Sequence, residues 1–122
     1  MKKHIIAASL LLSITAMVIS CNKTSGTTDM GAPVTNINIV APMNYSPANI
    51  SVPVGTIVKW TNTDPGSDHT VTSTVSGTPM PLNSSTIASG ATYSYTTTAT
   101  GTFPYHCTVH GLMMSGVLTV TP

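Results

Sequence analysis

The sequence predicts an all-β fold in which two sheets pack face to face as a sandwich of about seven strands. Thr, Ser, Val and Gly are abundant and strong helix formers are scarce, a composition that favours strands. Apolar and polar residues alternate in short runs separated by Gly, Pro, Asn and Asp, and no apolar repeat of helical period exceeds two turns. The predicted domain spans residues 35–122, which is enough chain for a small core.

The N-terminal segment is expected to be a targeting signal and not part of the folded domain. Residues 1–20 have a basic start at Lys2 and Lys3 followed by an apolar run, which predicts a secretory signal peptide. The signal ends in Val-Ile-Ser-Cys, which resembles the lipobox of bacterial lipoproteins. That resemblance implies that Cys21 is lipidated and becomes the first residue of the mature chain; the alternative is an ordinary cleaved signal beside an incidental cysteine. Residues 21–34 are then a lipidated cysteine and a flexible tether.

The first half of the domain is expected to begin with a strand over residues 36–40, where Ile37 and Ile39 share one face. Residues 44–54 contain two prolines and are predicted to form an irregular extended stretch. A glycine turn then leads into a strand over 55–62. This strand places three side chains on one side: Val58, Trp60 and Asn62.

The second half of the domain is expected to contain strands over 69–74, 91–98, 102–107 and 116–120. The strands of both halves are expected to pair antiparallel. Residues 75–90 show weak periodicity and are predicted to cross from one sheet to the other as a loop. The alternation places the following side chains on common faces: His69 with Val71, Tyr93 with Tyr95, Phe103 with Tyr105 and Cys107, and Leu118 with Val120.

The chain carries very little charge. Only 6% of its residues are charged. Without the signal, two lysines stand against three aspartates, a formal charge near −1. Nucleic-acid binding is therefore not expected, because it needs clustered Lys and Arg, and long-range steering toward a partner should be weak.

The segment "YHCTVHGLMMSG" (residues 105–116) gathers soft and titratable side chains in an otherwise bland sequence. Cys107 and His110 lie three residues apart across a predicted turn, and His69 is the remaining histidine outside this segment and the signal. One thiolate, two imidazoles and a thioether match the trigonal copper site with a weak axial Met. Zinc gains little from a thioether, and iron–sulfur clusters need more Cys. The segment therefore predicts one copper ion.

The stretches "GTFPYHCTVHGLMMSGVLTV" and "VPVGTIVKWTNTD…DHTV" resemble the cupredoxins, the small blue copper proteins, especially the plastocyanin and amicyanin group. The resemblance covers residues 35–121 and implies a Greek-key sandwich with a type 1 copper site whose equatorial ligands are His69, Cys107 and His110. For the axial ligand, the step into the last strand favours Met114, because a one-residue slip would turn that strand's apolar residues outward. Spacing from the second His favours Met113, which stays the alternative.

The resemblance also implies roles around the ligands. Asn62 is expected to be the amide that steadies the Cys107 loop, unless it is only a turn residue, and Thr108 belongs to the same surrounding shell. His106 stands where plastocyanins have an exposed Tyr, so a second electron route there is not expected, and alternation places His106 at the surface. Partner docking is assigned to a neutral apolar patch beside His110, formed by Gly111, Leu112 and Met113.

The function expected from this reading is one-electron transfer by copper cycling between Cu(II) and Cu(I), with a cytochrome, oxidase, reductase or dehydrogenase as partner. The protein is expected to be a monomer held by its lipid to a membrane of the bacterial cell envelope, facing the periplasm or the exterior. Enzyme activity is not expected, because four protein ligands leave no open position on the metal. The alternatives are a copper-binding or copper-delivery protein and a structural sandwich without metal.

Overall fold

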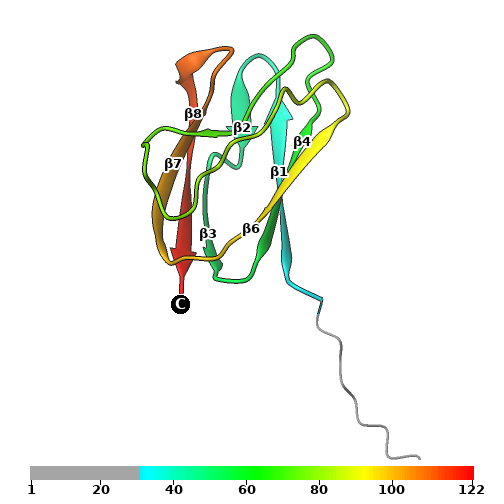
Figure 1. The fold of residues 1–122 in the computed structure, drawn as a ribbon. Helices are drawn as coiled ribbons and strands as arrows, with labels where there is room; N and C mark the ends of the chain where they lie inside the picture. Colours follow the sequence, from blue (N-terminus) through cyan, green and yellow to red (C-terminus); the bar gives the residue numbers. More distant parts are fainter. Residues whose placement is uncertain (1–30) are drawn as a thin grey trace, which may run out of the picture.

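The computed structural model describes residues 31–122, which form two four-stranded sheets packed face to face (Figure 1). One sheet has the order β2-β1-β4-β6 and the other β3-β8-β7-β5. The predicted signal peptide, Cys21 and most of the predicted tether lie outside the described residues. Within residues 31–122, no helix is long and apolar enough to span a membrane. The strands are β1 (Val34–Val40), β2 (Asn44–Ser46), β3 (Asn49–Pro53), β4 (Ile57–Asn62), β5 (Thr72–Ser73), β6 (Thr92–Thr96), β7 (Gly101–Cys107) and β8 (Gly111–Thr121).

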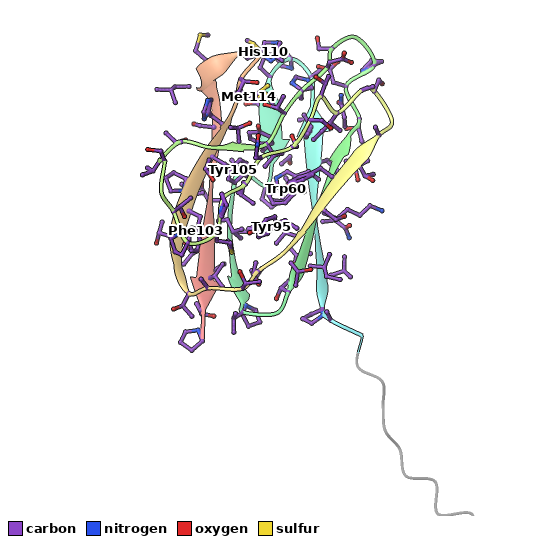
Figure 2. The ribbon with its side chains drawn as sticks, viewed as in Figure 1. Trp60, Tyr95, Phe103, Tyr105, His110 and Met114 are labelled. Carbon is purple, nitrogen blue, oxygen red and sulfur yellow. The ribbon has the colours of Figure 1, made fainter. Side chains whose placement is uncertain are left out.

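The predicted alternation builds the core between the two sheets. Trp60 and Tyr105 are fully buried at its centre, with ring centroids 5.6 Å apart and an edge-to-face angle of 83° (Figure 2). Tyr105 also packs edge-to-face on Tyr45 at 4.8 Å. The all-β, two-sheet fold class is therefore confirmed. The inward-facing residues predicted from the period-two pattern are buried here: Ile37, Ile39, Val58, Asn62, His69, Val71, Phe103, Cys107, Leu118 and Val120.

The prediction of antiparallel pairing throughout is wrong for two strand pairs. β1 pairs with β4 in parallel, with Ile37 opposite Trp60, and β3 pairs with β8 in parallel, with Ile50 opposite Leu118. After β1 and β2 the chain crosses to the other sheet as β3, then returns to the first sheet as β4. The crossing removes the hairpin that would have imposed antiparallel pairing between β1 and its next neighbour.

Two further segments differ from the predicted elements. The stretch 44–54 forms two short strands, β2 and β3, which brings the total to eight. Of the strand predicted over 69–74, only Thr72–Ser73 (β5) forms a regular strand. The residues around it are paired instead with the loop that follows, which folds back beside them. His69 and Ile87 exchange backbone hydrogen bonds in an isolated bridge, and Thr72 forms a second bridge with Asn83. As predicted, this loop crosses between the sheets, since β5 and β6 belong to different ones.

The site residues lie at one end of the sandwich, where β7 turns into β8. His110 and Met114 are at the upper end in the view of Figure 2, whereas the C-terminus and the start of β1 are at the lower end (Figure 1). The β7–β8 connection therefore lies at the end of the domain opposite the start of β1 and the C-terminus.

Candidate metal centre

A tight connection between β7 and β8 places Cys107 and His110 together. The register between the strands shifts after His106, so that Cys107 pairs with Gly111. Gly111 has φ +66°, a conformation that glycine adopts without strain and that reverses the chain here. This turn brings the imidazole of His110 back over the thiol of Cys107.

The spacing of the donor atoms fits a single metal ion. The Sγ of Cys107 lies 3.8 Å from Nδ1 of His69 and 3.6 Å from Nδ1 of His110, and one donor atom from each of the three residues lies within 4.8 Å of the others. With the bond lengths of zinc sites, about 2.3 Å to sulfur and 2.0 Å to nitrogen, an angle of 110–120° at the metal separates these donors by about 3.5–3.7 Å. The observed distances therefore match two donors that share one ion.

Burial identifies which methionine accompanies these three residues. Met114 is 1% exposed, whereas Met113 is 82% exposed and its side chain lies in solvent. The strand register explains the difference: β8 alternates strictly from Met114 through Gly116, Leu118 and Val120, all buried. The thioether of Met114 is thus the one positioned with the thiolate and imidazoles, and it makes the donor set soft enough for copper.

The environment of the Cys107 sulfur is fixed by Thr70. The backbone N–H of Thr70 donates to Sγ at 3.3 Å. The Thr70 hydroxyl oxygen accepts the backbone N–H of Thr108 at 2.9 Å and lies 3.0 Å from the Thr108 hydroxyl. One residue thus ties the segment after His69 to the turn after Cys107. Thr108 was predicted to belong to the surrounding shell; Thr70 was missed, although its position directly after a predicted ligand was a usable signal.

The predicted contact between Asn62 and the Cys107 loop is wrong. The Asn62 amide is fully buried, but it donates to the backbone carbonyls of Ser67 and Ile87, at 2.8 and 2.9 Å, and its Oδ1 accepts the backbone N–H of Asp64 at 3.0 Å. Asn62 ends β4 on the side of the loop that precedes His69, so its side chain reaches that loop. It therefore supports the approach to His69.

That loop places Asp64 against His69. Asp64 Oδ1 accepts the backbone N–H of Gly66 at 2.9 Å, and Oδ2 lies 3.2 Å from Nε2 of His69. The hydrogen bond from Gly66 and, after it, the contact with His69 hold the pKa of the Asp64 carboxyl below its usual range. The sequence reading did not single out Asp64, because a carboxylate in a short polar loop usually faces water.

The surface over the site is apolar at its rim. His110 is only half-buried, and after it, at the start of β8, Leu112 is 69% exposed and Met113 is solvent-exposed. Gly111, between His110 and Leu112, is exposed as well. His106, predicted to lie at the surface, is half-buried, with Nδ1 3.3 Å from the Thr74 hydroxyl. The residues predicted to dock a partner are thus exposed around the one ligand that approaches solvent.

Comparisons with known proteins agree with this geometry. Residues 33–121 match the model of a family described as copper binding proteins, plastocyanin/azurin family. A purple cupredoxin from Nitrosopumilus maritimus is 28% identical, with a TM-score of 0.62, covering 71% of this chain and 99% of that protein. A reduced amicyanin mutant is 33% identical, with a TM-score of 0.61 and coverage of 75% and 83%. A copper-containing nitrite reductase from Thermus scotoductus SA-01 is 26% identical, with a TM-score of 0.67, but only 22% of that longer chain is covered. No curated protein sequence matches the chain.

Proposed function

Because the chain belongs to the plastocyanin/azurin family of copper-binding proteins, we propose that it carries single electrons through one type 1 copper site. The observation that supports this most directly is the donor set of His69, Cys107 and His110, spaced for one ion and completed by buried Met114. Copper bound there supplies a one-electron Cu(II)/Cu(I) couple. With four protein donors, no position stays open for a substrate, so a carrier is favoured over an enzyme.

The surroundings of the four residues suit a site that changes little when an electron moves. His69 is held by its backbone bridge with Ile87, and Cys107 ends a strand paired on both sides. Thr70 binds both Cys107 and Thr108 through its backbone and hydroxyl. Donors fixed by strands and backbone hydrogen bonds stay in place, which keeps the reorganisation on electron transfer small.

The electron would leave through the edge of His110. This imidazole lies between the Cys107 sulfur and the exposed turn. Gly111, Leu112 and Met113 form a neutral apolar surface around it, suited to brief contact with a redox protein such as a cytochrome, oxidase, reductase or dehydrogenase. With only Lys59, Asp64 and Asp68 charged in the described chain, the association rate should depend weakly on salt. We expect the domain to work as a monomer.

We also propose that the domain is tethered through a lipid on Cys21 to a membrane of the cell envelope, facing the periplasm or the exterior. The start of β1 lies at the end of the sandwich away from His110, so a tether entering there would leave the His110 edge free (Figures 1 and 2). Mass spectrometry of Cys21 in the exported chain tests the lipid; an unmodified Cys21 would remove this part of the proposal.

Copper delivery is the second candidate. The exposed thioether of Met113 beside the half-buried His110 offers a soft donor at the mouth of the site, through which Cu(I) could pass to an acceptor. The rate at which copper leaves the protein distinguishes the two functions. An electron carrier retains its copper during repeated oxidation and reduction, whereas a delivery protein loses Cu(I) rapidly to a chelator.

Copper reconstitution with optical and EPR spectroscopy tests the main proposal. The oxidised chain should show the intense visible absorption and narrow hyperfine splitting of a type 1 site. Cys107→Ser should abolish the colour while circular dichroism shows that the metal-free domain still folds. His106→Asn, next to the ligand but bonded to Thr74, is the matched control and should keep the colour. Retention of the same spectrum in Cys107→Ser would refute the site.

A further inference from the structure

A buried carboxylate stands behind His69, on the side of the ring away from the Cys107 sulfur. Nδ1 of His69 faces Sγ of Cys107 at 3.8 Å, and Nε2 of the same ring lies 3.2 Å from Oδ2 of Asp64. His69 is completely buried and Asp64 is 4% exposed. The two ring nitrogens are therefore used separately, one toward the donor cluster and one toward the carboxylate.

This contact determines which nitrogen of His69 carries the proton. An ionised carboxylate only accepts hydrogen bonds, so Nε2 must be the N–H donor. In the neutral imidazole Nδ1 then keeps its lone pair, which is the form that a metal ligand needs. Asp64 thus selects the tautomer and fixes the ring plane before any metal arrives, as carboxylates behind metal-bound histidines do in other metal sites.

The loop that carries Asp64 is built to hold the carboxylate there. Asn62 accepts the backbone N–H of Asp64 and donates to Ser67, so it fixes both sides of the turn. Gly66 donates to Oδ1 and leaves Oδ2 free for His69. These hydrogen bonds hold the loop between β4 and His69 in the conformation that places Asp64 against His69. Most of the other residues of the loop are exposed.

The charge of Asp64 is uncompensated nearby. Within residues 31–122 the Lys, Arg, Asp and Glu side chains are Lys59, Asp64 and Asp68, and no Lys or Arg there lies within 4.0 Å of the Asp64 carboxylate, whose close partner is the His69 imidazole. A negative charge held in a buried hydrogen bond to a ligand interacts more strongly with the metal than it would in water. It stabilises Cu(II) more than Cu(I), because the higher metal charge is attracted more strongly.

We propose that Asp64 is a positioning residue that holds His69 in its Nε2–H tautomer and lowers the reduction potential of the copper site. The inference rests on the proposed function, because it concerns the electronics of that site. It adds a residue that sets how readily the domain gives up its electron.

The test compares Asp64→Asn and Asp64→Ser with Asp68→Asn in the full chain. Asp68 lies next to His69 in sequence but is exposed, and the hydrogen bond to the ring comes from Asp64, so the Asp68 variant removes the same charge without removing that bond. The serine variant keeps an oxygen for Gly66 and is too short to reach His69, which guards against a folding failure of the asparagine variant. Cu(II) and Cu(I) affinities are measured by chelator competition, reduction potentials by voltammetry, and the His69 tautomer by ring ¹⁵N NMR of the metal-free chain.

We expect both Asp64 variants to lose about 10–100-fold in Cu(II) affinity. Cu(I) affinity should fall less; each tenfold difference between the two losses corresponds to a potential about 59 mV higher. The ring nitrogens of His69 should no longer show one dominant Nε2–H form, and Asp68→Asn should match the wild type in all three measurements. Equal potentials in the Asp64 and Asp68 variants, with normal copper uptake, would overturn the inference alone. Failure of the wild-type chain to take up copper would instead overturn the proposed function.

Discussion

Gly116 is the position where one methyl group should do the most damage to the fold. It faces the core from β8, opposite Tyr105 on β7. A Cβ at this position would lie 2.4 Å from the backbone oxygen of Ala48 and 2.5 Å from Cζ and Oη of Tyr105. Ordinary carbon contacts are about 3.5–4.0 Å, so both neighbours would have to move by about an ångström.

The cost follows from what those neighbours hold in place. The Ala48 carbonyl accepts the N–H of Val117 at 3.0 Å and the hydroxyl of Tyr105 at 3.3 Å, and Tyr105 packs on Trp60. Overpacking costs about 1–3 kcal/mol and each strained hydrogen bond about 0.5–1.5 kcal/mol. Gly116→Ala should therefore lower the free energy of unfolding by about 3 kcal/mol, despite the small gain that alanine brings by restricting the unfolded chain.

Urea unfolding of the metal-free protein, followed by tryptophan fluorescence, measures this change. Gly66→Ala is the matched control, since its added Cβ meets only Asp64 Oδ1 at an ordinary 3.7 Å and its φ is not positive. We expect the control to change the free energy of unfolding by less than about 1 kcal/mol. A loss below 1 kcal/mol in Gly116→Ala would show that β8 and Tyr105 can move apart freely, and would refute the argument.

Three further predictions concern the metal, the axial donor and alkaline pH. Copper at 100 times its Kd should stabilise the fold by about 2.7 kcal/mol, seen as a higher Tm that a chelator reverses; an unchanged Tm would mean no binding to the native state. Met114→Leu should alter the visible spectrum and the potential, whereas Met113→Leu should leave both unchanged, and the opposite result would exchange their roles. Burial raises the pKa of Tyr105 to about 12, so the unfolded phenol, with a pKa of about 10, ionises first. Between pH 9 and 11 the Tyr105 phenol should therefore cost about 1.4 kcal/mol in denaturant unfolding. Burial also raises the pKa of Tyr45 and Tyr93, so Tyr105→Phe should show a smaller loss than the wild type by about that amount, and an equal loss in both would refute the assignment.

The inward faces of the strands were predictable because burial follows a local rule. Alternation alone placed Trp60, Tyr105 and Cys107 inward, and all three are buried. The partners of the strands were not predictable in the same way. Nothing in the period of residues 36–40 says that β1 will lie parallel to β4, because pairing depends on where the chain crosses between sheets.

In the candidate site, too, some features were predictable from the sequence and others were not. The three donors could be predicted from the chemistry of "YHCTVHGLMMSG" and one distant histidine, and strand register selected Met114. The contacts that support them could not be predicted as well: Asn62 supports the loop before His69, and Thr70 binds the sulfur. Such contacts depend on the path of a short loop, which no periodicity describes.

The position of β8 in its sheet has a consequence for the order in which the protein matures. β8 lies between β3 and β7, and it is synthesised after the other seven strands of residues 31–122. A nascent chain that lacks β8 has neither a continuous second sheet nor the thioether of Met114, and the turn that carries His110 has nothing to close against. Metal acquisition must therefore follow synthesis of this strand, so a partly translated chain cannot capture copper in the geometry of the finished domain.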